Sequence, residues 1–344
     1  MSTVRTLRLG ALRLRVTRRG TVAGILLAVV IVVLAAAGVM IGDYPMTTWQ
    51  TLQALTGTGA DHLAQYFVQQ QRVPRVLTAA LVGAALAASG SIFQPLSANP
   101  LGSPDVIGFT VGSATGALVQ IIVFGGGPVA TAVGALVGGF GTALVVYVLA
   151  WRRGLAGFRL VLVGIGVAAV LQGLNSLLVV RASLAAAQTA SVWLAGSFNT
   201  TTWTEAGLVA LAVVVLGPIA LALSRPLSIM TMGDDLATGL GVRVERTRLW
   251  LVVVGVALVS LATAAAGPIA FVALAAPQLA RRVTGTRGVG MPGAMLMGAA
   301  LVLAADVVAQ RLFAPTQLPV GVVTGALGGV YLIWVLARQW RRNA

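Results

Sequence analysis

Long apolar runs, each bounded by short polar or basic stretches, repeat along the whole sequence. A helix needs about 20 consecutive apolar residues to cross the hydrocarbon core of a membrane. About ten runs approach that length, and we expect helices at 21–41, 76–96, 104–124, 128–150, 159–180, 204–223, 247–265, 268–282, 291–313 and 318–337. The pattern therefore predicts an all-α, polytopic membrane protein with about ten transmembrane helices.

The run at 268–282 is the shortest of these. Gly267 and Pro268 separate it from the run before it, and its length of about 15 residues also suits a re-entrant helix. The first run follows a basic stretch, as in a secretory signal, but it is longer than the apolar core of a signal peptide. We therefore expect an uncleaved first helix, a basic tail over residues 1–20 and a single transmembrane domain over 21–344.

Composition and charge support this class and suggest an orientation. Hydrophobic residues make up 58% of the chain and charged residues only 9%, and the mean hydropathy is +0.95. All 23 basic residues are arginine; with a cytoplasmic N-terminus, 19 fall in cytoplasmic segments and only Arg72, Arg75, Arg181 and Arg311 fall outside. The positive-inside rule then places both termini in the cytoplasm. Because the arginines are spread over several segments, we expect no nucleic-acid partner.

The chain lacks the residues that several kinds of chemistry require. It has no cysteine for a thiolate site and no lysine for a phosphate-binding loop, so ATP hydrolysis by that route needs a separate subunit. We expect no catalytic residue, no metal site and no cofactor bound by this chain. Asp306 is the one acid we expect within the membrane, either in a proton relay or bonded to Gln310 and holding its helix.

The connection at 224–248 is densely charged in a chain that otherwise carries little charge. Asp234 and Asp235 are expected in the first turn of a short helix, with Gly239 and Gly241 at its end, because acidic side chains favour a helix N-terminus. By itself this segment could be an ordinary solvated loop, or it could be the place where an ATPase subunit docks.

Six segments in a fixed order carry a resemblance to a known family. They are RVPR at 72–75, GAALAASGSIFQPLSANPLGSPDVIG at 83–108, WLAGS at 193–197, GDDLATGLG at 233–241, GPIAFVALAAPQLARRVTG at 267–285 and ADVVAQRLFAPTQLPVGVVTGALGG at 305–329. The chain resembles the FecCD-type permease subunits of ATP-binding-cassette (ABC) importers for ferric siderophores, haem and cobalamin. The resemblance covers almost the whole chain and implies a type II ABC importer permease architecture in a bacterial cytoplasmic membrane.

The resemblance also implies roles for particular residues. The segment at 233–241 matches the coupling helices that contact the ATPase, so the coupling candidates are Asp234, Asp235, Leu236, Ala237, Gly239, Leu240 and Gly241. Arg72 and Arg75 match arginines that dock a substrate-binding protein, and Arg311 is a third docking candidate. The alternative for the first two is that they snorkel at a helix start.

Candidates for the pathway or its gate are Gln94, Asn99, Pro100, Gly157 and Phe158. The Asn-Pro turn could instead cap the helix before it. Four positions depart from the common family pattern. Gln278, Gln310 and Gln317 stand where a histidine, an arginine and a glutamate are frequent, and residues 328–330 read Gly-Gly-Val where Gly-x-Pro is frequent.

The function expected from these features is that of a permease, not an enzyme. It would translocate ferric siderophore by alternating access, together with two ATPase subunits that use ATP and magnesium, an extracytoplasmic binding protein and a second permease chain within the lipid bilayer. The second chain is expected to be a paralogue, or else a further copy of this chain. Alternatives are a cobalamin or haem permease of the same family and a gradient-driven secondary transporter.

Overall fold

A computed structural model describes residues 4–9, 12–42, 44–58, 61–151, 157–286 and 288–343. Three of the arginines assigned to cytoplasmic segments, Arg152, Arg153 and Arg287, lie outside these ranges. The elements are β1 Val4–Leu9, β2 Leu12–Thr17, α1 Arg18–Met40, α2 Thr48–Thr56, α3 His62–Tyr66, η1 Phe67–Arg72, α4 Val73–Leu96, α5 Phe109–Leu118, η2 Val119–Val123, α6 Pro128–Ala150, α7 Gly157–Arg181, α8 Leu184–Leu194, α9 Trp203–Met230, α10 Asp234–Gly239, α11 Val244–Ala266, α12 Val272–Thr284, α13 Met291–Arg311 and α14 Val320–Asn343. The two η elements are π-helical.

Among the described residues, seven helices are long and apolar enough to cross a membrane. They are Arg18–Met40, His62–Leu96, Pro128–Ala150, Gly157–Arg181, Trp203–Met230, Val244–Ala266 and Met291–Arg311. Phe109–Val123 and Val320–Ile333 are shorter apolar helices at the third and last predicted runs. This confirms the predicted helical membrane class. The weakest run, at 268–282, forms the 13-residue helix α12, which is too short for a full span.

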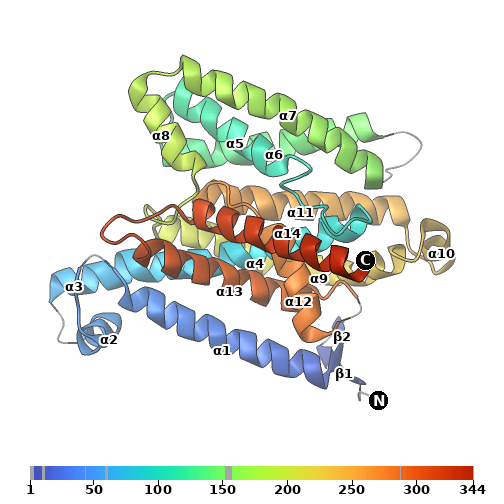
Figure 1. Cartoon of the computed structure of the whole chain (residues 1–344), viewed down its shortest axis with the longest axis horizontal. Coiled ribbons are helices and arrows are strands. Elements are labelled where there is room, and N and C mark those ends of the chain that lie inside the picture. The colour runs from blue at the N-terminus through green and yellow to red at the C-terminus, as the bar shows by residue number, and fades with distance from the viewer. Residues whose placement is uncertain are drawn as a thin grey trace.

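The long helices lie side by side along the long axis of the molecule (Figure 1). The central helix α4 contacts α9, α11, α12 and α13, whereas α5, α6, α7 and α8 form a second group that adjoins α11 through α5 and α6. At one end lie β1, β2, α10 and the end of α14, and at the other lie α2 and α3 (Figure 1). The coupling and docking candidates therefore occupy opposite ends.

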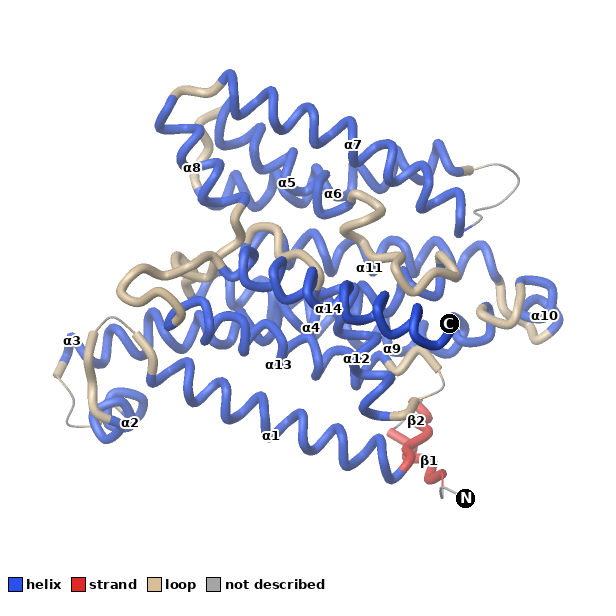
Figure 2. Tube along the Cα trace, in the orientation of Figure 1, coloured by secondary structure: helices blue, strands red, loops and turns tan. Residues whose placement is uncertain are grey.

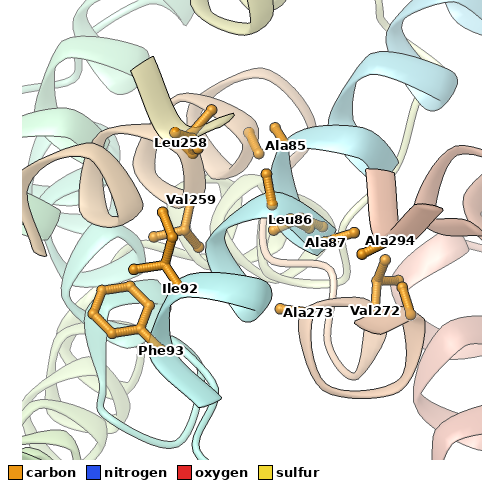
Figure 3. Packing of buried hydrophobic residues seen from close by; sticks show 14 of the residues in the cluster. Ala85, Leu86, Ala87, Ile92, Phe93, Leu258, Val259, Val272, Ala273 and Ala294 are labelled. Atoms are coloured by element: carbon orange, nitrogen blue, oxygen red, sulfur yellow. The ribbon is translucent and has the colours of Figure 1, made fainter. Parts of the chain in front are cut away.

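Small residues let α4 occupy this centre. Of its most apolar 18-residue stretch, 78% is buried, against 11% for α7. A Cβ atom on Gly83 would lie 2.3 Å from the carbonyl oxygen of Gly298, and one on Gly90 would lie 1.8 Å from that of Ala273, so the backbones can meet only at glycine. Figure 3 shows Ile92 of α4 on the side of Val259 of α11, within this core.

Some elements were not expected from the sequence. The predicted basic tail contains an antiparallel hairpin in which Leu7 pairs with Leu14 and Arg8 with Arg13, and α1 follows it directly (Figure 2). The second helix begins at His62 rather than at 76 and passes without a break through η1 into α4. The short helices α2, α3 and α8 also lie in stretches that were expected to be connections.

Candidate functional site

The charged connection at 224–248 forms the short helix that was predicted for it. Gly233 precedes α10 with a φ of 114°, and Gly241 follows it with a φ of 84°, a region of backbone space that favours glycine. Asp234 and Asp235 lie in the first turn, where the helix dipole favours a carboxylate. The helix is therefore bounded by two glycine turns between the long helices α9 and α11.

One arginine fastens α10 to the rest of the molecule. The guanidinium group of Arg248 donates to Oδ1 and Oδ2 of Asp234 at 3.0 and 2.9 Å and to Oε1 of Glu245 at 3.0 Å. Ala237 is buried, whereas Leu236 and Leu240 are 51% and 63% exposed. The result is a fixed helix that presents two leucines to its surroundings at the end of α9 and α11. The coupling candidates other than buried Ala237 are thus exposed at this end of the molecule.

At the opposite end, Arg72 is buried, with only 6% of it exposed. Its guanidinium group donates to the carbonyl oxygens of Val39 and Tyr44 at 3.1 and 2.6 Å. The last carbonyl groups of a helix have no partner within the helix, and Arg72 supplies donors at the end of α1. It neither snorkels nor offers its side chain at the surface, so its proposed docking role is not apparent in this structure.

Arg75 lies one turn further along and pairs with Asp306. Its Nε and Nη2 donate to Oδ2 and Oδ1 of Asp306 at 3.0 and 2.8 Å, and its Nη1 donates to Oε1 of Gln317 at 2.9 Å. Gln310 donates to Asp306 Oδ2 at 2.9 Å, as one of the two sequence-based alternatives expected. Asp306 is 1% exposed, and this network joins α4, α13 and the segment before α14.

Of the three docking candidates, Arg311 is the one whose side chain is exposed; it lies at the end of α13. Two of the three glutamines that depart from the family pattern, Gln310 and Gln317, bind the Arg75–Asp306 pair. Sequence reasoning missed this ion pair, because its partners are 231 residues apart.

The pathway candidates gather around the Asn-Pro loop, residues 97–102. Asn99 and Phe158 face a cavity of about 530 Å³, whose lining also includes Ser97, Ala98, Val161, Leu162 and Ile165. Gly157 lies against the end of α4, since a Cβ atom there would be 2.2 Å from the carbonyl oxygen of Leu96. The structure therefore brings together residues that are far apart in sequence.

The backbone of the Asn-Pro loop also caps α4. Ala98 has a left-handed φ of 49°, its N–H donates to the carbonyl of Pro95, and the N–H of Asn99 donates to that of Gln94. This is the Schellman arrangement that commonly ends a helix. The Asn99 side chain accepts from the N–H of Leu101 at 2.9 Å. The two sequence-based alternatives are thus compatible, because the loop both caps the helix and lines the cavity.

The other side of the loop meets α12 and α14. Gln278 donates to the carbonyl oxygen of Pro100 at 2.8 Å and accepts from the hydroxyl of Tyr331 at 3.2 Å. Gln94 is buried, donates to the carbonyl oxygen of Leu274 at 2.9 Å and accepts from Arg281 at 2.8 Å. Sequence reasoning missed Arg281 and Tyr331; the departure at Gln278 was the one signal nearby.

Another acid besides Asp306 is half-buried next to this region. Asp105 lies between α4 and α5, where it accepts hydrogen bonds from the Thr110 hydroxyl at 2.5 Å and from the backbone of Phe271. Its Oδ2 is buried without a hydrogen-bond partner in the described part of the chain. Since Thr110 belongs to α5 and Phe271 precedes α12, this carboxylate connects the starts of two helices.

Comparison with known proteins gives a consistent result. The chain is 47% identical over 328 residues to the ferric enterobactin transport system permease protein FepG of Escherichia coli (strain K12), an alignment that covers 95% of this chain and 99% of FepG. It is 33% identical over 337 residues to the permease protein FepD of the same organism, named for the same transport system, covering 96% of this chain and 98% of FepD.

Among solved structures, the chain is similar to a metal-chelate type ABC transporter in an inward-facing conformation. The TM-score is 0.82 with 30% sequence identity, and the match covers 93% of this chain and 99% of that one. The model of the FecCD transport family matches residues 26–338, which is most of the chain. The chain therefore belongs to the FecCD transport family.

Proposed function

We propose that this chain is the membrane-spanning permease subunit of an ATP-driven importer that carries ferric siderophore across the cytoplasmic membrane by alternating access. The observation that carries the proposal is its similarity to FepG over nearly the full length of both chains. The exposed helix α10 and the cavity beside the Asn-Pro loop are compatible with this proposal and support it.

In this proposal, α10 receives the motion of the ATPase subunits. Two such subunits bind ATP and magnesium, while this chain binds no cofactor and breaks no covalent bond. Leu236 and Leu240 would enter a groove of one ATPase subunit, and Arg248 holds α10 against α11. Because α9 and α11 both contact α4, a displacement of α10 can reach the Asn-Pro loop at the end of α4. Both termini then lie on the cytoplasmic side with α10.

Two further partners belong to the proposal. At the end where α2 and α3 lie, an extracytoplasmic binding protein would dock. Arg311 is the exposed arginine among its candidate contacts, and Arg72 and Arg75 would take part only after leaving their present partners. A second permease chain would complete the pathway. A paralogue is favoured over a copy of this chain, because two different permease proteins, FepG and FepD, are named for one transport system.

Uptake measurements test the proposed function. We expect cells that lack this chain to lose uptake of an iron-loaded siderophore, to regain it when the chain is restored, and to take up labelled cobalamin normally throughout. Loss of cobalamin or haem uptake with unchanged iron uptake would replace the substrate. Siderophore uptake that follows the proton gradient and persists without the ATPase subunit would instead support a secondary transporter.

A further inference from the structure

A groove of about 710 Å³ lies between α5, α6 and α7, in the second helix group (Figure 1). It shares no lining residue with the cavity at the Asn-Pro loop. Glycine and valine make up most of its described lining, which contains no charged residue and three polar ones, Thr115, Gln120 and Thr142. The groove is therefore a separate and almost wholly apolar feature, to which the proposed function assigns no role.

Glycines explain both the floor of this groove and the space in it. A Cβ atom on Gly116 of α5 would lie 1.9 Å from the carbonyl oxygen of Gly134 of α6, so the two backbones touch there. Gly141 of α6 and Gly166 of α7 differ, because a Cβ atom on either would meet nothing within 4 Å in the described chain. The groove thus has a close-packed floor and open space beside Gly141 and Gly166.

The groove lies within the membrane-spanning part of these helices. Its residues on α6 run from Val133 to Val145, a length of about 18 Å in a helix. One leaflet of the hydrocarbon core is about 15 Å thick, half of the whole core. Val137 of α6 and Val170 of α7 border the groove and are 67% and 72% exposed. In a bilayer, hydrocarbon rather than water therefore meets these side chains.

The groove also faces away from the proposed pathway. On α7, Phe158, Val161 and Ile165 line the cavity at the Asn-Pro loop, whereas Val167 and Val170 line the groove. With 3.6 residues per turn, these two sets of residues lie on opposite sides of the helix. The second permease chain is proposed on the first side. The second side is then left to the surrounding lipid.

We propose that this groove binds one acyl chain of a membrane phospholipid. Protein interiors are closely packed, and an unfilled space loses the dispersion contacts of the atoms that line it. A flexible hydrocarbon chain can follow the walls of the groove and restore these contacts. Phe124 borders the groove at the connection between η2 and α6, so the lipid headgroup is expected at that end, with the acyl chain running toward Val145.

The test uses the complete transporter, with both permease chains and the ATPase, in detergent to which lipid is added in known amounts. The probe is a phosphatidylcholine with a photoreactive diazirine near the end of one acyl chain, and mass spectrometry locates its adducts. We expect adducts on groove residues such as Val137 and Val170 to saturate as probe is added. Adducts on the exposed face of α1, for example at Val29, should rise in proportion to the probe.

Filling the groove should displace the acyl chain. Gly141→Leu with Gly166→Leu places two side chains in the open space, and we expect groove labelling to fall at least about tenfold, equivalent to about 1.4 kcal/mol of binding free energy. The variant should fold, because leucine favours a helix more than glycine does. Gly173→Leu on α7 and Gly207→Leu on α9 are matched controls, since a Cβ atom on either also meets nothing within 4 Å and neither lines the groove. Both should be labelled as wild type is.

Other results would overturn the inference. Groove labelling that never saturates would show ordinary boundary lipid, as on α1. Unchanged labelling in the filled variant would show that the acyl chain lies elsewhere. If no lipid adduct forms in the groove and Val137→Cys cross-links to the second permease chain, a protein covers the groove instead. Should the filled variant fail to assemble, Val137→Trp narrows the groove from its exposed border and gives the same comparison of labelling.

Discussion

Arg72 ends η1 and Arg75 lies one turn further along in α4, yet their guanidinium groups meet different acceptors. Arg72 donates to backbone carbonyls at the end of α1, and Arg75 donates to the carboxylate of Asp306. An arginine facing carbonyl groups provides hydrogen bonds, whereas one facing a buried carboxylate also neutralises a charge. Neither role was visible in the residue types alone, since both arginines were predicted at the outer surface. The partners come from α1 and α13, and only the fold brings them near.

The buried pair makes a prediction at this scale. Asp306→Asn leaves Arg75 without its counter-charge in a buried site, and breaking a buried pair in this way destabilises a protein by about 3–5 kcal/mol. We expect a clearly lower thermal unfolding temperature in detergent and less protein in the membrane. The double variant Asp306→Asn with Arg75→Gln should regain part of the loss because no unpaired charge remains. Arg311→Gln, exposed on the same helix, serves as the control and should unfold as wild type does. Wild-type stability of Asp306→Asn would mean that the pair does not form.

At the scale of helices, what could be predicted depended on the length of the apolar pattern. Runs of about 20 residues identified the long spans well, because few other structures accommodate such a run. The glutamines at 69, 70 and 71 interrupt the apolar pattern of the second helix, so its start at His62 was not predicted. The helix is π-helical over Phe67–Arg72, the stretch that contains these glutamines. The short length of α12 follows from Phe271, which has a φ of 67° directly before the helix. The pattern of polar residues gives no sign of such a backbone conformation.

The helix α10 was predicted correctly, and its exposed leucines lead to a test of coupling. Leu236→Glu with Leu240→Glu places two charges on the surface proposed to enter the ATPase. Loss of central contacts at such an interface commonly costs 2 kcal/mol or more, so we expect at least about tenfold weaker association with the ATPase. Siderophore uptake should fall accordingly. Co-purification with the ATPase subunit and uptake are the two measurements.

Two other variants of α10 separate contact from folding. Leu236→Met keeps an apolar side chain of similar volume and should retain uptake. Asp234→Lys with Asp235→Lys should also abolish coupling, but Asp234 binds Arg248, so this pair of changes will loosen α10 as well. Normal ATPase association by the glutamate variant, or uptake independent of the ATPase, would exclude α10 as the coupling element.

At the scale of the whole molecule, the cavity at the Asn-Pro loop is open on one side. Phe158, Leu162 and Ile165 of α7 line it, yet they are 74%, 59% and 48% exposed. Their spacing places them along one face of the helix. A translocation pathway bordered by this face therefore needs a second wall from another chain. That the loop residues and Phe158 border a pathway stays a prediction from the sequence, and the open side of the cavity depends on how α7 lies relative to α4.

Cross-linking can show what covers this face, and the chain is well suited to it because it contains no cysteine. We expect a cysteine introduced by Ile165→Cys to cross-link to the second permease chain in intact membranes when that chain carries cysteines along its matching helix. Val29→Cys, on the exposed face of α1, should meet only lipid and give no product. A cross-linked product contains either two copies of this chain or one copy of this chain and one of the second permease. Different tags on the two chains distinguish these products. We expect the mixed product, because FepG and FepD are two different permease proteins named for one system. A product joining two copies of this chain would show a homodimer, and efficient cross-linking through Val29→Cys with none through Ile165→Cys would place the partner on α1 instead.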